Sequence, residues 1–336
     1  MALSRSNQFD DGTVLTESKL EGEFDNIYNN ALSLISPLTG NLAFGNNDGT
    51  GIDELAFTDA AAAVTAVGRL RRNNNTLEWH DRTGAVALQT LIGGGIFGLT
   101  ITNDTTDATN DISVAIGAAV DSTANRVIRF GTALIKRLDA AWAVGTNQGM
   151  LDTGAIANTT YHIHLIHRSD TGVSDYLASA SATAPTMPTS YDYRRRIGSI
   201  LRESATIIPF TQDGDYFQRN TQIQDVAATN PGTAAVTRTL SVPIGINVLL
   251  HCGVGVNNAT SAGVGVFLSD LATVDSAPST TFITTRAGTA GEQAWGDAHV
   301  RTNTSAQIRS RISPSGAADV LYINTRGWYD TRGRNV

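Results

Sequence analysis

The chain changes its hydrophobic period near residue 40. In residues 18–35 the apolar positions are spaced four, three, four and three residues apart: Leu20, Phe24, Ile27, Ala31 and Leu34. This spacing predicts a helix with one apolar stripe. Ser18 and Glu21 resemble a capping box, and Pro37 ends the pattern. Two heptads are too short to form a stable coiled coil alone, so we expect this helix to dock outside the chain's own core.

From about residue 75 the period is two, which predicts strands separated by Gly, Asn, Asp and Thr turns. In the middle of the chain we expect strands within 75–81, 98–104, 111–120, 125–139 and 159–170, then a proline-marked loop and a strand within 183–204. Seven more are expected within 237–245, 246–258, 263–270, 280–288, 296–305, 307–314 and 320–330. Short strands at such regular spacing are typical of antiparallel sandwiches and jelly rolls.

These patterns predict a mainly β protein with an N-terminal α-helix followed by two antiparallel β-domains. We divide it into an anchoring segment (1–50), a linker with a small β element (51–95), a central β-domain (96–205) and a C-terminal β-sandwich or jelly-roll-like domain (206–336). Within 246–256, the even-numbered residues share one face, which makes Cys252 a core residue. His251 then points to the opposite face.

Composition narrows the functional classes. Charged residues make up only 16% of the 336 residues and the net charge is −7. That balance provides no basic surface for binding nucleic acid. A low content of charged residues suits a protein with large subunit interfaces. The single cysteine fits synthesis in a reducing cytoplasm. We expect no signal peptide and no membrane insertion, because no apolar run reaches the roughly 18 residues that a membrane helix needs.

No motif in the sequence nominates a catalytic site or a cofactor. Asp213 and Asp215 flank a glycine, and a hairpin turn explains them better than a calcium loop, because the other oxygen ligands are missing. The acidic residues near 48–54 receive the same interpretation. The four tryptophans are dispersed, which favours core or interface positions over sugar stacking: Trp79, Trp142, Trp295 and Trp328.

The stretch TTYHIHLIHRSD holds three histidines within six positions, His162, His164 and His167. On a strand, His162 and His164 share a face with Ile166, whereas His167 lies on the other face. One chain therefore cannot bring all three to one metal ion. Two alternatives remain: His162 and His164 pack metal-free at a sheet surface or interface, or they converge with their copies on the axis of a trimer and bind a metal.

Four segments carry a resemblance. Residues 12–42 resemble the N-terminal segment of tail fibre and related virion proteins of tailed bacteriophages, residues 136–204 resemble a recurrent phage fibre module, and residues 277–281 and 300–334 resemble its C-terminal β-domain. The resemblance implies a non-enzymatic homotrimer in the virion, assembled in the host cytoplasm. Its N-terminus would bind a tail, portal, adaptor or baseplate protein, and its distal β-domains would face a host surface glycan or protein.

Three hypotheses follow. The first is a tail fibre or spike that contacts the host, for which exposed loops in 257–263 and 285–298 are the default contact sites. The second is an architectural head fibre, capsid decoration or tail-collar protein without receptor binding. The third, a capsule-degrading enzyme, is disfavoured because no acid–base pair is nominated.

Overall fold

A computed structural model describes residues 17, 18, 21, 69–73, 76–81, 84–87, 93–259 and 263–334 of the chain. The chain divides into two compact units, residues 1–88 and 89–336. The predicted helix at 18–35 lies outside the described residues except at Ser18 and Glu21, which are helical together with Glu17. Three helical residues do not support the predicted helix, and its five stripe residues lie outside the described ones.

The first unit contains a three-stranded antiparallel sheet in the order β1-β2-β3. Its strands are β1 (Arg69–Asn73), β2 (Thr76–Asp81) and β3 (Gly84–Ala87). β2 and β3 form a hairpin in which Asp81 pairs with Gly84. These three strands lie within the range 51–95, where the sequence predicts a linker with a small β element.

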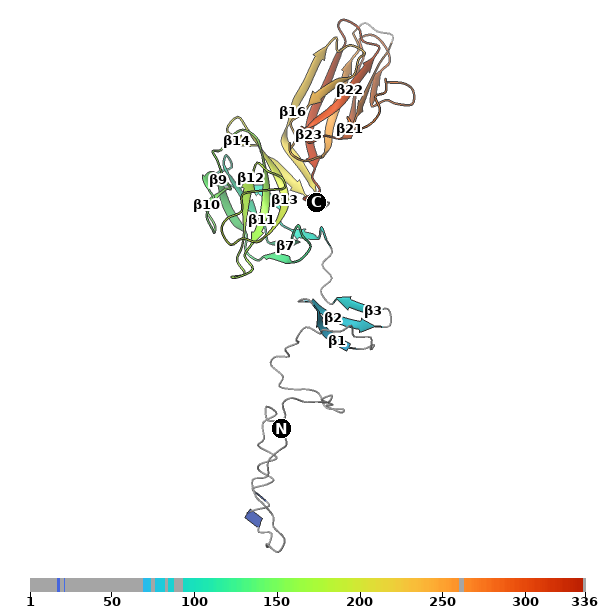
Figure 1. Ribbon diagram of the computed structural model, residues 1–336. Helices are drawn as coiled ribbons and strands as arrows, with labels where there is room; N and C mark the ends of the chain where they lie inside the picture. The colour runs from blue at the N-terminus through green and yellow to red at the C-terminus, as the bar shows by residue number, and fades with distance from the viewer. Residues whose placement is uncertain are drawn as a thin grey trace. The chain divides into compact units, whose positions relative to one another are not determined.

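The second unit begins with two sheets. An eight-stranded sheet has the order β14-β13-β11-β12-β10-β9-β6-β5, and a three-stranded sheet has the order β4-β7-β8 (Figure 1). The strands are β4 (Ile96–Gly98), β5 (Ile101–Asn103), β6 (Asp111–Val114), β7 (Gly117–Val120), β8 (Val127–Phe130), β9 (Leu134–Ala141), β10 (Gln148–Leu151), β11 (Thr160–His167), β12 (Ser174–Ser179), β13 (Tyr193–Glu203) and β14 (Thr206–Ile207).

Two long strands predicted in this region are each broken in two. The segments 111–120 and 125–139 give β6 with β7 and β8 with β9, and the two halves of each join different sheets. The breaks fall at Ala115–Ile116 and at residues 131–133. There the chain leaves one sheet and enters the other, a change of direction that alternation of apolar residues does not reveal.

The expectation of a purely antiparallel central domain is also wrong, because β10 is parallel to both β9 and β12. The loop 142–147 brings the chain back to run in the same direction as β9. The Lys136 ammonium holds this loop by donating to the Ala143 carbonyl at 2.7 Å, and Asp175 accepts from the Gly145 amide at 2.8 Å. Lys136 and Asp175 are themselves a buried ion pair at 2.8 Å.

The remaining strands form two antiparallel sheets, with orders β15-β16-β23-β18-β21 and β17-β22-β19-β20. They are β15 (Phe210–Asp213), β16 (Tyr216–Thr229), β17 (Val236–Thr239), β18 (Leu249–Asn257), β19 (Val264–Ser269), β20 (Thr285–Ala287), β21 (Gln293–Arg301), β22 (Gln307–Ser313) and β23 (Val320–Tyr329). All seven strands predicted after residue 236 are present. Asp213 pairs with Tyr216 across a two-residue turn, which confirms the hairpin at Gly214 and Asp215.

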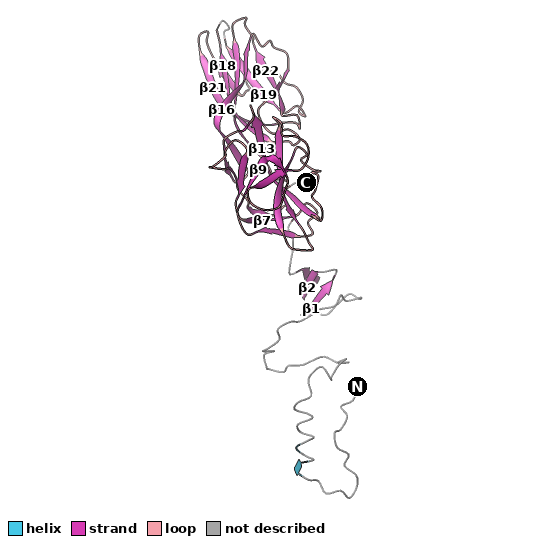
Figure 2. Ribbon diagram, turned by 90° about the vertical axis from the view of Figure 1, so that its left-hand side faces the viewer, coloured by secondary structure: helices cyan, strands magenta, loops and turns pink. Residues whose placement is uncertain are grey.

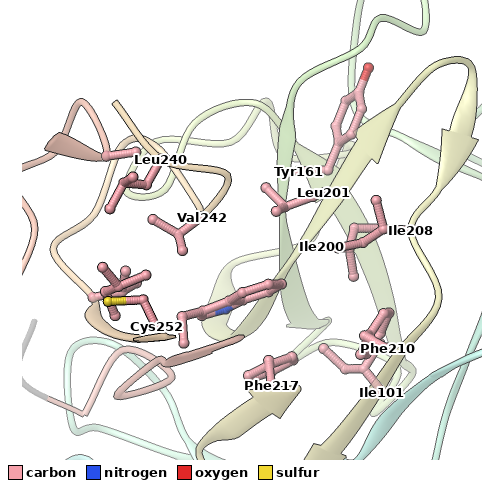
Figure 3. Close-up of a cluster of buried hydrophobic side chains, with 14 of the residues drawn as sticks. Ile101, Tyr161, Ile200, Leu201, Ile208, Phe210, Phe217, Leu240, Val242 and Cys252 are labelled. Atoms are coloured by element: carbon pink, nitrogen blue, oxygen red, sulfur yellow. The ribbon is translucent and has the colours of Figure 1, made fainter. Parts of the chain in front are cut away.

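One hydrophobic core runs through both β-domains of the second unit. In Figure 3, Phe217 of β16 lies near Ile101 of the central domain. Gly198 of β13 allows this approach, since an added Cβ would lie 2.7 Å from Ile101 and 2.9 Å from Phe217. Cys252 is fully buried in the same core, as the alternation in β18 predicts.

The described part of the second unit consists of strands and loops only (Figure 2). The protein is mainly β, as predicted. No helix among the described residues is long and apolar enough to cross a membrane.

Candidate functional site

The histidines of β11 are buried, and His162 lies at the junction of the two β-domains. His162 is fully buried, and its Nδ1 lies 2.9 Å from the Ser199 hydroxyl of β13. The backbone of Gly245 from the C-terminal domain packs against its ring, because an added Cβ would lie 3.0 Å from Nε2. Burial, and then the nearby Arg196 charge, lower the pKa of His162 to about 4, so the imidazole is neutral at physiological pH.

His164 occupies the same face and is also buried. Its Nε2 lies 3.0 Å from the Ser181 carbonyl oxygen, which only accepts hydrogen bonds, so Nε2 carries the proton. Burial lowers the pKa of His164 to about 3. His167 has its Nδ1 2.9 Å from the Ser174 hydroxyl. Among the described residues, no group of three or more His, Cys, Asp or Glu side chains is arranged to hold a metal ion.

The alternation predicted for this strand is confirmed. Ile163 and Leu165 belong to the main core, whereas Ile166 belongs to a separate small cluster on the opposite face. Within one chain, His162 and His164 share a face and are occupied by contacts to Ser199 and to the Ser181 carbonyl. These contacts fit the packing alternative for the two histidines.

A buried ion-pair network surrounds His162. Arg196 of β13 donates to both carboxylate oxygens of Asp330 at 2.6 Å, and the Ser199 hydroxyl donates to the same carboxylate at 3.0 Å. Arg332 then donates from its Nε to the Ile197 carbonyl at 2.7 Å and from Nη2 to the Leu99 carbonyl at 2.6 Å. The segment after β23 is thus fastened to the central domain, so this region is structural.

The outer face of the five-stranded sheet carries a row of aromatic rings. We call it the aromatic face, and it is formed by Tyr216, His251, Trp295, His299, Tyr322 and Tyr329. At one end, the rings of His251 and His299 stack at a centroid distance of 4.6 Å, and the Tyr216 hydroxyl shares a 2.8 Å hydrogen bond with His251 Nδ1. Tyr329 packs on Tyr216 with centroids 4.6 Å apart.

At the other end of the aromatic face, Trp295 of the edge strand β21 lies near-parallel to Tyr322, with ring centroids 5.7 Å apart and planes inclined by 18°. Its side chain is 53% exposed. Between the two ends, Arg326 pairs with Asp297 and lies over Gly253. Aromatic rings beside a guanidinium and a carboxylate can stack against a ligand and also hydrogen-bond with it.

A second concave feature lies in the central domain. A cavity of about 670 Å³ opens above Trp142 and Tyr191, whose rings meet edge to face at 5.1 Å. Its charged rim groups already have partners. Asp152 accepts from the Thr186 amide at 2.9 Å, and Arg168 pairs with Asp170 at 2.7 Å. The cavity therefore offers mainly apolar contacts.

The loop range 285–298 that the sequence suggests as a contact site is occupied largely by β20 and β21. Trp295 falls within the loop range 285–298, although it lies on a strand rather than at a loop tip. Residues 260–262 of the other expected loop lie outside the described residues. Trp328 is fully buried, as expected of a core tryptophan, whereas Trp295 is exposed within the chain. The sequence interpretation overlooked the alternate glycines of β18, Gly253 and Gly255. They lie on the face opposite Cys252 and have no side chains, so that surface is shallow.

No model of a known protein family and no curated protein matches the chain. Among solved structures, a chain of the structure of infectious bursal disease virus Gx strain is similar at 12% sequence identity, with a TM-score of 0.18, over 71% of this chain and 73% of that one.

Proposed function

We propose that this chain is a non-enzymatic component of a bacteriophage virion, a homotrimeric tail fibre or spike. Its N-terminal segment attaches to the particle through a tail, portal, adaptor or baseplate protein, and its C-terminal domain contacts the host cell surface. The observation that carries the contact role is the aromatic face, where the rings of Trp295, His299 and Tyr329 are exposed. The resemblance of residues 12–42, 136–204 and 300–334 to phage fibre segments supports the virion role.

The junction supports the same proposal mechanically. A host-contacting domain transmits force to the particle only if it is firmly joined to the domain that precedes it. Here the joint is a buried bidentate ion pair between Arg196 and Asp330, together with Arg332 bonded to backbone carbonyls. Such charge-assisted bidentate contacts fix orientation as well as distance.

The test of the virion role uses particles of the phage that carries the gene. Mass spectrometry of purified particles should detect the chain, and electron microscopy should place it on the tail at a copy number that is a multiple of three. A chain lacking residues 1–40 should still fold but should be missing from particles. Normal incorporation of the truncated chain would contradict N-terminal attachment, and a monomer by mass photometry would contradict the trimer.

An architectural role without receptor binding is the second candidate. It is favoured by the exposed apolar side chains of the central domain, since Phe97 is 79% and Ile116 60% exposed, which suits contact with a neighbouring subunit. Microscopy separates the two candidates, because a head or collar position with the aromatic face covered supports the architectural one. An enzyme is tested by incubating the chain with host polysaccharide, and new reducing ends would contradict the proposal.

A further inference from the structure

The Trp295 indole lies over a glycine of the neighbouring strand. Gly255 of β18 pairs directly with Trp295 of β21. A Cβ added to Gly255 would lie 2.7 Å from two carbons of the six-membered ring, which is closer than such atoms approach. The six-membered ring of the indole therefore lies over the Gly255 backbone, beside Tyr322. The Trp295 side chain is 53% exposed, so a large part of it is open to solvent.

Besides the Tyr322 ring, the neighbours of this indole on the sheet are polar side chains. Two residues away on the same face of β21 are Gln293 and Asp297, and Asn324 of β23 pairs with Gly253 next to Gly255. Asn324 Oδ1 and Arg326 Nε are both buried and have no hydrogen-bond partner among the described residues. Both residues are half-buried, so each presents further polar atoms at the surface beside the ring.

From this arrangement we infer that the aromatic face binds a saccharide, with a pyranose ring stacked on Trp295 and its hydroxyl groups bonded to Asp297, Arg326 and Asn324. A pyranose has an apolar C–H face that suits an exposed indole. Around its edge it carries hydroxyl groups that donate to a carboxylate or an amide oxygen and accept from a guanidinium. The inference rests on the proposed host-contact role and adds the ligand class and the site.

A second copy of the chain is the competing occupant of this face. Stable subunit interfaces have apolar, charge-depleted centres. Trp295 instead has Gln293, Asp297, Asn324 and Arg326 around it, and the Asp297 side chain is 58% exposed. Burying these groups against another protein would require partners for each of them, whereas a polyhydroxylated ligand supplies such partners. The polar frame therefore favours a saccharide.

The experiment applies the full-length protein to an immobilised array of bacterial and synthetic pyranose oligosaccharides. Bound sugars are then titrated by calorimetry. Trp295→Ala should weaken binding by about tenfold or more, as removal of an anchoring tryptophan does. Trp295→Phe should retain part of the affinity, and Asp297→Asn should also weaken it. Phe97→Ala is the matched control, because it removes an even more exposed aromatic ring from the central domain.

Saccharide binding that is lost in Trp295→Ala and kept in Phe97→Ala supports the inference. Three outcomes overturn it: no array sugar binds, binding is unchanged in Trp295→Ala, or Trp295→Ala converts an oligomer to monomers. A different result contradicts the proposed function, namely that the chain is absent from virions. A virion chain that adheres to host cells equally well with and without Trp295 overturns the saccharide site alone.

Discussion

Arg196 and Asp330 form a bidentate ion pair in which both side chains are buried, with both nitrogen–oxygen distances at 2.6 Å. The pair joins β13 of the central domain to the residue that follows β23 of the C-terminal domain. Burial alone would raise the pKa of Asp330, but the Arg196 charge and the hydrogen bonds from Arg332 and Ser199 hold it below its usual range. The carboxylate therefore stays ionised and paired inside the protein.

Asp330→Asn should destabilise the protein strongly. The substitution leaves the Arg196 guanidinium buried without its counter-charge, and loss of one partner of a buried pair costs about 3–5 kcal/mol. Urea denaturation at pH 7 measures the change in the free energy of unfolding. Asp297→Asn is the matched control, since its pair with Arg326 is exposed and should contribute less than about 1 kcal/mol. Equal losses in the two variants would contradict a special role for the junction.

The stability of the protein should fall below about pH 6.5. The pKa values of His162 and His164 drop from 6.5 to about 4 and about 3, mainly because both are buried. Above pH 6.5 both are neutral in the folded and unfolded states. As the pH falls, the unfolded chain gains protons that the folded chain does not take up, so the free energy of unfolding decreases until the folded pKa values are reached. The free energy of unfolding should decrease by up to about 1.4 kcal/mol per pH unit for each histidine.

Denaturation curves from pH 7 to pH 4.5 test this dependence, and His164→Gln isolates one contribution. The glutamine amide can still donate to the Ser181 carbonyl but does not titrate, so the variant should have a shallower slope. Asp111 has the opposite effect on stability, because burial and then Asp107 raise its pKa to about 6. The folded chain therefore takes up this proton before the unfolded chain does, which increases the free energy of unfolding as the pH falls. The comparison between variant and wild type cancels this effect. An unchanged slope in His164→Gln would show that His164 titrates normally in the folded protein.

The strands of the C-terminal domain could be predicted because each has one face in the core and one outside. Even-numbered residues of β18 from Leu250 to Val256 are buried, so alternation alone located the strand and gave Cys252 its place. In β11 every residue is buried. There alternation still separated the faces, but the sequence could not indicate that a second domain covers His162.

The features that were not predicted depend on contacts between distant parts of the chain. The direction of β10 depends on Lys136 and Asp175 holding a loop, and those residues are 39 positions apart. The pair of Arg196 and Asp330 spans 134 positions. The position of the Trp295 ring depends on Gly255 in the neighbouring strand. No local pattern encodes such pairs, because local periodicity gives the face on which a residue lies but not its partner.

Cys252 should be unreactive in the folded protein. Its side chain is fully buried, and burial raises the pKa of the thiol to about 12, which suppresses the reactive thiolate. A thiol reagent such as dithionitrobenzoate should give almost no colour with native protein at pH 8. It should give one equivalent after denaturation. Rapid labelling of the native protein would mean that the core around β18 opens readily.

Gly255→Ala should lift the Trp295 indole away from the sheet. The new methyl group would occupy space now filled by the ring, with carbons only 2.7 Å away, and the exposed side chain can rotate outward more easily than the strand backbone can move. In a proton–nitrogen NMR spectrum, the Trp295 indole N–H resonance, assigned with Trp295→Phe, should shift. Saccharide affinity should decrease with it, because the ring no longer presents the same face. Gly131→Ala is the control, since an added Cβ there meets no atom within 4 Å. An unmoved indole resonance in Gly255→Ala would show that Gly255 does not determine the position of the ring.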